Sequence, residues 1–158
     1  MKIIVPIGIS GSGKSKLYLD EFKDKGYILV CPDNIRKKLT GDISDQSKNK
    51  EVFEYANTLI DIYIRYNVNV YFDATNLNKK LRKKFVNKYK DNPNVEIHYY
   101  ILPADIKLSN ERIQKNLSNN IDRSKVPYDV LERQIKMYND TIKKGFGDEN
   151  VHKVIMIK

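Results

Sequence analysis

A glycine-rich segment between an apolar run and a helical pattern constrains this chain more than any other feature. Residues 8–15 read Gly-Ile-Ser-Gly-Ser-Gly-Lys-Ser. They fit the phosphate-binding loop (P-loop) pattern of a glycine, four free positions and Gly-Lys-Ser. Residues 2–7 are typical of a buried strand, and residues 16–22 can continue as a helix,. A strand before the loop and a helix after it are the context that the motif needs.

The P-loop residues supply the groups that a triphosphate requires. The glycines Gly8, Gly11 and Gly13 let consecutive backbone N–H groups turn toward a phosphate, and the helix N-terminus adds a positive dipole. Lys14 can reach the β- and γ-phosphates, and the Ser15 hydroxyl can hold Mg²⁺. We therefore expect the chain to bind a nucleoside triphosphate. The predicted phosphate-binding residues are Gly8, Ser10, Gly11, Ser12, Gly13, Lys14 and Ser15.

Apolar runs alternate with helical patterns along the whole chain. Each run is nearly continuous, as expected of strands covered on both faces. The alternation predicts a three-layer α/β fold with a five-stranded parallel sheet, whose ligands bind beyond the carboxyl ends of the strands. Pro6 is expected near the end of its strand, because proline costs a ladder hydrogen bond. The predicted strands cover residues 2–8, 27–31, 68–73, 95–102 and 152–157. The helical stripes are Val52-Ala56-Leu59-Tyr63-Tyr66, Leu81-Phe85-Tyr89 and Leu131-Ile135-Tyr138-Ile142.

Length and composition limit the class of protein. A chain of 158 residues predicts one domain, residues 1–158,. No apolar run approaches the roughly 20 residues that cross a bilayer. The first strand already occupies the N-terminus, so we expect neither a membrane partner nor a signal peptide. The single cysteine, Cys31, cannot form an internal disulfide, which fits a reducing compartment,. The expected location is the cytoplasm of a cell or of an infected host.

Two carboxylates follow predicted strands at the edge where the P-loop lies. Asp33 follows the second strand and Asp73 ends the third. Asp33 either caps a helix over residues 34–40 or accepts the proton of an attacking hydroxyl. Arg36 lies three residues on along the same helical face and can pair with a phosphate, which favours the second interpretation. Asp73 either caps the helix that begins near residue 78, or holds the water shell of a metal or orients Arg36.

The net charge of +9 favours an anionic partner, and nucleic acid is the commonest one,. A lysine-rich composition that keeps the protein in solution explains the charge equally well. Basic residues crowd the predicted helix that follows Asp73, and most of them are expected on its solvated face. Lys79 and Arg82, in its first turn, are the expected contacts to a polyanionic acceptor.

Together these motifs resemble the P-loop polynucleotide 5′-kinases, the phage-type repair enzymes that phosphorylate 5′-hydroxyl ends of DNA or RNA. The resemblance covers most of the chain. It implies a P-loop NTPase fold with a helical lid over about residues 112–130, and ATP and Mg²⁺ as donor and cofactor. The residues that carry it are 7–15, Pro-Asp-Asn-Ile-Arg at 32–36, Asp-Ala-Thr-Asn-Leu-Asn at 73–78 and Arg-Ser-Lys-Val-Pro-Tyr-Asp-Val-Leu at 123–131.

The resemblance also implies a role for each acceptor-side residue. Asp33 would be the base for the 5′-hydroxyl, and Arg36 would hold the neighbouring phosphate of the acceptor. Asp73 would organise the acceptor side together with Asn76 and could hold Mg²⁺ through water. Lys14 would join Asp33 as a catalytic residue.

The polar, basic segment of residues 118–127 can close over the triphosphate as a lid,. Residues 41–47 are predicted to form a second loop, whose composition also suggests a functional role. Arg123 resembles the lid arginine that stabilises charge on the transferring phosphoryl group and also contacts ATP. Either Arg123 acts alone, or Arg112 or Lys115 shares this work.

The sequence thus predicts an enzyme that transfers the γ-phosphate of ATP to the 5′-hydroxyl end of DNA or RNA. A kinase with a small-molecule acceptor is the first alternative: a nucleoside, a nucleotide, a sugar or a zeta-toxin-like substrate. A non-catalytic nucleotide-binding module is the second, although a pure binder needs neither Asp33 nor an arginine-bearing loop. No residue pattern reads a 2′-hydroxyl, so DNA and RNA are not distinguished. Nor does any pattern indicate the oligomeric state.

Overall fold

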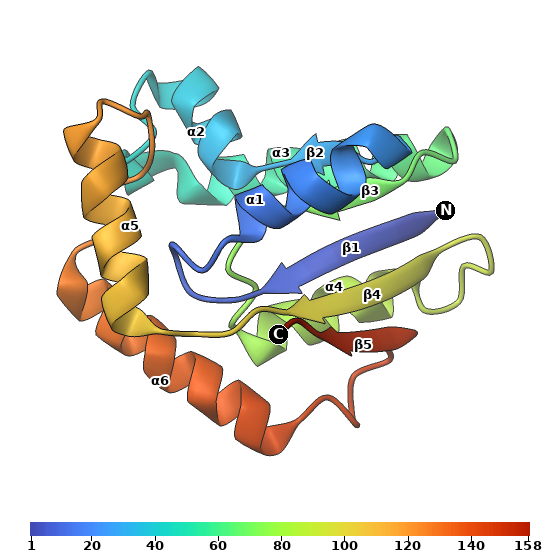
Figure 1. Cartoon of the computed structure of the whole chain (residues 1–158). Coiled ribbons are helices and arrows are strands. Elements are labelled where there is room, and N and C mark those ends of the chain that lie inside the picture. The colour runs from blue at the N-terminus through green and yellow to red at the C-terminus, as the bar shows by residue number, and fades with distance from the viewer.

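The computed structural model describes residues 1–158 and contains one five-stranded sheet with helices on both faces (Figure 1). The strands are β1 (Lys2–Ile7), β2 (Ile28–Val30), β3 (Val70–Phe72), β4 (Glu96–Ile101) and β5 (Lys153–Met156). Their order across the sheet is β2-β3-β1-β4-β5, and every neighbouring pair is parallel. The predicted parallel α/β sheet is therefore confirmed, with β2 and β3 shorter than their apolar runs.

Helices cover the two faces of the sheet unequally. Three long helices bury one face: α3 (Asn49–Arg65), α4 (Lys79–Tyr89) and α6 (Tyr128–Lys144). The other face carries the short α1 (Lys14–Leu17), a π-helical turn η1 (Tyr18–Phe22) and a 3₁₀ turn η2 (Lys23–Lys25). In β1, Ile3, Val5 and Ile7 belong to the main core, whereas Ile4 packs with Phe22 on the second face. In β1 and β3, burial on both faces explains why the apolar runs are continuous rather than alternating, whereas the edge strand β5 is mostly exposed although its run is also apolar,.

The remaining helices surround the carboxyl edge of the sheet. They are α2 (Pro32–Thr40), the 3₁₀ turn η3 (Gln46–Lys48) and α5 (Ile106–Ser118). Residues 119–127, which we call the lid loop, connect α5 to α6. The predicted lid of about residues 112–130 therefore consists of the second half of α5, the lid loop and the first turn of α6. No helix is both long enough and apolar enough to span a bilayer.

Pro6 lies one residue before the end of β1, as expected. The register of β1 with β3 stops at Ile4 opposite Tyr71, so no strand faces Pro6 on that side. Instead, the Pro6 carbonyl accepts a hydrogen bond of 2.7 Å from Asn76 Nδ2. The absent N–H of proline therefore costs no ladder hydrogen bond.

Two helix starts differ from the simplest capping interpretations. Helix α2 begins at Pro32, a residue suited to the first turn, and Cys31 occupies the N-cap position,. Asp33 is therefore not the N-cap, and the capping interpretation of this residue is wrong. Helix α4 is capped by Asn78, whose Oδ1 accepts from Leu81 N at 3.1 Å, so Asp73 is not a cap either.

The buried face of α4 is rotated from the predicted stripe. Leu81 is 61% exposed, and the buried residues of the helix are Arg82, Val86 and Tyr89. The prediction for Leu81 is wrong because a charged residue, Arg82, fills the buried position. Tyr66, the last residue of the stripe predicted for residues 52–66, is likewise exposed, because it lies at the C-cap of α3.

Candidate active site

The P-loop connects β1 to α1 at the carboxyl edge of the sheet and presents free backbone donors. Gly11 and Gly13 have positive φ angles of 76° and 102°, which glycine adopts without a steric penalty,. No acceptor within the chain takes up the N–H groups of Gly11, Gly13, Lys14 or Ser15. A run of free N–H groups at the start of a helix is an anion-binding arrangement.

Lys14 folds back onto the loop that it follows. Its Nζ donates to the carbonyl oxygens of Ile9 at 2.7 Å and Gly8 at 3.2 Å, and the residue is only 8% exposed. The pKa of Lys14 is lowered to about 8, chiefly by burial and also by Arg123, while Asp73 and Asp33 act to raise it. These mutual effects place three of the predicted site residues within electrostatic range of the Lys14 ammonium.

A hydrogen bond joins the side chains of Ser15 and Asp73. The Ser15 hydroxyl donates to Asp73 Oδ2 at 2.7 Å, and Asp73 is buried. Burial raises the pKa of Asp73, whereas Lys14 and the Ser15 hydrogen bond lower it. The chain has no cluster of three or more His, Cys, Asp or Glu side chains for a metal. Mg²⁺ is commonly bound by one or two protein oxygens together with substrate phosphates, and the Ser15–Asp73 pair fits that mode.

Asp33 and Arg36 form an ion pair on the first turns of α2. Arg36 is buried, and its Nη2 donates to Asn49 Oδ1 at 2.8 Å. Asn49 in turn donates to Gln46 Oε1 at 2.6 Å, so the guanidinium is fixed between α2 and the start of α3. The Asp33 side chain remains 46% exposed. In such a pair the fixed arginine can bind a charged acceptor, and the accessible carboxylate can remove a proton from that acceptor.

The lid loop brings Arg123 to the same site. Burial lowers the pKa of Arg123, and the Asp33 carboxylate opposes this change. Its Nε is buried and has no hydrogen-bond partner. Arg123 also lowers the pKa of Lys14, so its guanidinium lies near both the P-loop and Asp33. A cation in this position can stabilise charge that develops on a phosphoryl group.

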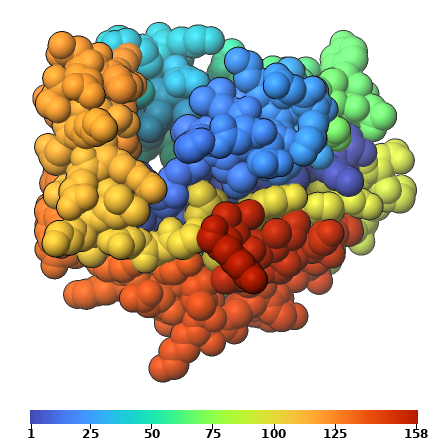
Figure 2. Space-filling model, in the orientation of Figure 1, coloured from blue at the N-terminus to red at the C-terminus, as the bar shows by residue number.

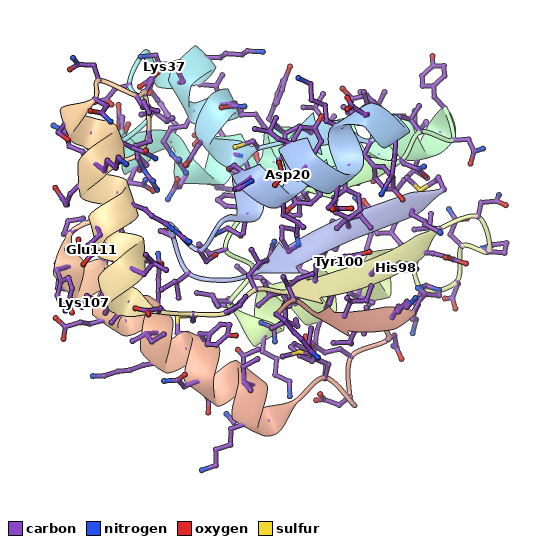
Figure 3. The ribbon with its side chains drawn as sticks, in the orientation of Figure 1. Asp20, Lys37, His98, Tyr100, Lys107 and Glu111 are labelled. Carbon is purple, nitrogen blue, oxygen red and sulfur yellow. The ribbon has the colours of Figure 1, made fainter.

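Two contacts join the lid loop to α2 and to the segment after it. Lys37 Nζ lies 3.5 Å from Asp122 Oδ2, and the Lys125 N–H donates to Ser44 Oγ at 2.9 Å. Lys37 is labelled beside the lid loop in Figure 3. Figure 2 shows a hollow on this face between α5 in yellow and orange, α2 in teal and α1 in blue. The two loops that the sequence marks as functional therefore meet at the rim of the site.

Helix α5 also touches the P-loop. Arg112 Nη1 donates to the Gly11 carbonyl at 3.2 Å, whereas the exposed side chain of Lys115 makes no hydrogen bond. A Cβ at Gly11 would lie only 2.7 Å from the Ser109 backbone oxygen. The close approach explains why glycine is needed there. Of the two residues expected to assist Arg123, only Arg112 reaches the P-loop.

Gln134 on α6 is a contact that the sequence interpretation missed. Its Oε1 accepts from the Ser10 N–H at 2.8 Å, and its Nε2 donates to Ser10 Oγ at 3.1 Å. The residue lies three positions after the buried Leu131 and four before Tyr138, within the apolar stripe of the helix. The sequence did contain a signal for this contact, because a polar residue within an apolar stripe needs a hydrogen-bond partner in the fold.

Asn76 and Arg82 are engaged by the fold. Asn76, at a φ of 52°, donates its Nδ2 to three backbone carbonyls, so only its Oδ1 is available to an acceptor. Arg82 is 3% exposed and pairs with Glu149 at 3.0 Å. It also donates to the carbonyls of Asn76 and Leu77, at 3.0 Å and 2.9 Å. The expectation that Arg82 contacts a polyanion is wrong, because all three nitrogens of its buried guanidinium donate to groups of the fold. Lys79 pairs with a carboxylate at the surface.

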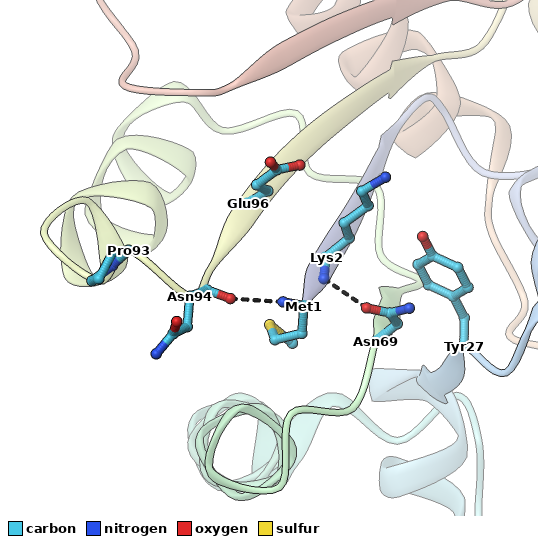
Figure 4. Close-up of a pocket in the computed structure, with 7 residues that line it drawn as sticks. All are labelled: Met1, Lys2, Tyr27, Asn69, Pro93, Asn94 and Glu96. Carbon is cyan, nitrogen blue, oxygen red and sulfur yellow. Dashed lines mark hydrogen bonds between the residues drawn. The ribbon is translucent and has the colours of Figure 1, made fainter.

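A second pocket lies at the amino ends of the strands, opposite the P-loop (Figure 4). It measures about 390 Å³. The N-terminal ammonium donates to Asn94 O at 2.7 Å, and the Lys2 N–H donates to Asn69 Oδ1 at 2.7 Å. None of the predicted site residues lines this pocket. Its lining residues are Met1, Lys2, Tyr27, Asn69, Pro93, Asn94 and Glu96.

Comparisons with known proteins agree with this fold. Residues 3–140 match the family model described as AAA domain. No curated protein matches the sequence.

Solved structures share the fold at low sequence identity. A chain of the Pnkp1/Rnl/Hen1 RNA repair complex is 18% identical with a TM-score of 0.76, over 91% of this chain and 46% of that chain. A chain from the PezAT toxin–antitoxin system of Streptococcus pneumoniae is 13% identical with a TM-score of 0.65, over 99% and 67%. Deoxyadenosine kinase from M. mycoides is 17% identical with a TM-score of 0.56, over 100% and 90%. The chain thus spans less than half of the repair-complex chain. The likeness establishes the fold and confirms the predicted P-loop α/β architecture.

Proposed function

This chain belongs to the AAA domain family, and from that premise and the geometry of its site we propose that it is an ATP-dependent kinase of nucleic-acid 5′-hydroxyl ends. One observation carries the proposal. The accessible Asp33 carboxylate lies beside the buried Arg36 and within electrostatic range of Lys14 and Arg123. A protein that only binds nucleotides has no need of a carboxylate there.

The reaction is an in-line displacement at the γ-phosphorus of ATP. The acceptor hydroxyl gives its proton to Asp33 as its oxygen forms a bond to phosphorus, and the bond to the β–γ bridging oxygen breaks to release ADP. The free N–H groups of the P-loop and the ammonium of Lys14 bind the triphosphate. Arg123 neutralises charge on the transferring group. When Mg²⁺ is bound by Ser15 and by Asp73 through water, it supplies further charge neutralisation on the phosphates.

Several features favour a nucleic acid as the acceptor. Arg36 is held rigidly next to Asp33, and its Nε has no hydrogen-bond partner, so we assign this cation to a phosphate adjacent to the reacting hydroxyl,. A nucleoside has no such phosphate, whereas the 5′-hydroxyl end of a polynucleotide has one, which links its first nucleotide to the second. The net charge of +9 attracts a polyanion,. The likeness to a chain of an RNA repair complex agrees with this choice.

A small-molecule acceptor is the second candidate. The lid loop contacts α2 and the segment after it, so these elements meet at the rim of the site. Deoxyadenosine kinase also matches this chain over nearly the full length of both proteins, so a nucleoside or nucleotide acceptor is the form that this alternative takes.

One transfer assay separates the candidates. The protein is incubated with Mg²⁺ and γ-labelled ATP, in parallel with a 5′-hydroxyl DNA oligonucleotide, its RNA counterpart, nucleosides, nucleotides and no acceptor. We expect label on the oligonucleotides alone. Label found only on a small molecule would refute the proposal, and the DNA and RNA arms decide between the two acceptors.

Two matched variants test the assigned base. Asp33→Asn is expected to lower transfer by about 10²–10⁴-fold with ATP binding largely retained, because it removes the proton acceptor. Asp24→Asn, at an exposed aspartate of η2 remote from the P-loop contacts, is the control and should transfer normally. Near-normal transfer by Asp33→Asn would show that another group accepts the proton.

A further inference from the structure

We propose that Gln134 is a positioning residue for the donor site: its amide holds Ser10 and thereby keeps the P-loop in the conformation that binds a triphosphate. The inference rests on the proposed function only in requiring that a nucleoside triphosphate binds the P-loop. It assigns a role in phosphate binding to a helix, α6, that holds none of the predicted phosphate-binding residues.

The two hydrogen bonds fix both ends of the Gln134 amide. Oε1 accepts from the Ser10 N–H at 2.8 Å while Nε2 donates to Ser10 Oγ at 3.1 Å. The reversed amide would place an NH₂ group against the Ser10 N–H, two donors facing each other, so only one orientation satisfies both contacts. One side chain therefore determines the orientation of a backbone group and of a hydroxyl in the same P-loop residue.

Ser10 immediately precedes the free donors of the P-loop. Its own N–H is used by Gln134, whereas those of Gly11, Gly13, Lys14 and Ser15 have no partner in the chain. Gln134 thus marks the boundary between the part of the loop bound to the fold and the part left for a ligand. Two glycines in this stretch have positive φ and many accessible conformations, so the loop depends on external contacts for its shape,.

Gln134 is one of three polar residues by which α6 binds the loops at the carboxyl edge. Tyr138 donates to the Leu102 carbonyl at 2.7 Å, at the end of β4. Thr141 donates to the Leu77 carbonyl at 3.4 Å, in the loop that follows Asp73. The three residues recur at helical spacing on one face of α6, and Gln134 is the member that contacts the donor loop. Because α6 also follows the lid loop, the helix gives Arg123 and the P-loop a common support.

The predicted consequence is a loss of triphosphate affinity rather than of folding stability. Both Gln134 and Ser10 are partly exposed, so their freed groups can bind water in the nucleotide-free variant,. The loosened P-loop must then be ordered when ATP binds, and the apparent affinity falls with the fraction of binding-competent molecules.

The test compares MgATP binding, by calorimetry, for four proteins and a control. Gln134→Met keeps the length and packing of the side chain and loses both hydrogen bonds. It is expected to weaken MgATP binding by between about fivefold and about thirtyfold, the range for one or two neutral hydrogen bonds. Ser10→Ala loses only the hydroxyl contact and should weaken binding less. The double variant should match Gln134→Met. Gln114→Met, on the exposed side of α5, is the control and should bind as the wild type does.

Thermal unfolding gives the second readout. In Gln134→Met the melting temperature without nucleotide should stay near that of the wild type, while the increase caused by MgATP shrinks. Wild-type affinity in Gln134→Met would overturn the inference, as would a lower melting temperature with an undiminished MgATP increment. Additive losses in the double variant would show that Gln134 does not act through Ser10. A protein that binds MgATP but phosphorylates no nucleic acid refutes the proposed function alone, since these affinities would still decide the role of Gln134.

Discussion

Replacement of Lys14 by methionine is expected to stabilise the nucleotide-free protein while it abolishes triphosphate binding. Lys14 is 8% exposed, and its pKa is lowered from 10.5 to about 8, chiefly by burial. Each pKa unit corresponds to about 1.4 kcal/mol. Folding therefore disfavours the charged ammonium, relative to the neutral amine, by about 3 kcal/mol. Methionine has a similar shape and no charge to desolvate.

The hydrogen bonds of Lys14 reduce the expected gain. Ile9 O also accepts from the Ser12 N–H at 3.2 Å, so it keeps a partner in the variant. Gly8 O loses the lysine donor at 3.2 Å, which costs about 1 kcal/mol,. The net expectation is that Lys14→Met raises the free energy of unfolding by about 2 kcal/mol near pH 7.

The pH dependence of this difference has a definite sign. Between about pH 8 and pH 10.5 the unfolded chain keeps the Lys14 proton and the folded chain loses it. Stability rises with pH wherever the unfolded state binds more protons, so the wild type gains stability through this window. The variant lacks the group, and its advantage should shrink by about 2 kcal/mol between pH 7 and pH 9.5.

Urea unfolding of both proteins at the two pH values, without nucleotide, measures the effect. The same titrations with MgATP should show stabilisation of the wild type only, because binding to the folded state requires the ammonium. A variant less stable than the wild type at pH 7, or a difference that does not change with pH, would refute this account of Lys14.

Three further substitutions test the supports of the site. Glu149→Gln leaves the buried Arg82 guanidinium without its carboxylate and is expected to lower the free energy of unfolding by about 3–5 kcal/mol; unchanged urea unfolding would contradict a buried ion pair,. Gly11→Ala places a Cβ 2.7 Å from a backbone oxygen of α5 at a φ of 76°, so a loss of about 2–4 kcal/mol is expected, together with weaker MgATP binding in calorimetry,. Tyr71→Phe removes the 2.7 Å hydrogen bond to the Lys14 carbonyl, and thermal unfolding should show a loss of about 1 kcal/mol, since that oxygen keeps a helical donor,.

The sheet and the donor loop were predictable because their signals are local in sequence. Continuous apolar runs located all five strands, and the Gly-Lys-Ser pattern located the P-loop. The three-residue spacing of Asp33 and Arg36 likewise predicted that they share a helical face, and the two side chains do form an ion pair. The start of α2 at Pro32 was the local feature that the capping interpretation overlooked.

Contacts between distant segments were not predictable in the same way. Arg82 was expected at the surface of a basic helix, and its partner Glu149 lies on another segment with no matching motif. Gln134 and Ser10 are similarly far apart along the chain. The use of Asn76 Nδ2 by the fold depends on where β1 ends next to β3, which only the assembled sheet determines. Pairings of this kind depend on the three-dimensional packing, and no periodic pattern in the sequence indicates them.

The position of β1 in the middle of the sheet has a consequence for biosynthesis. This strand is synthesised before the other four strands, yet it pairs only with β3 and β4, as in the registers of Ile3 with Val70 and of Ile7 with Ile101. Contacts between such distant residues form late, because long segments must first be brought together. We therefore expect that a nascent chain cannot retain ATP until β4 has emerged, although its P-loop has been synthesised long before.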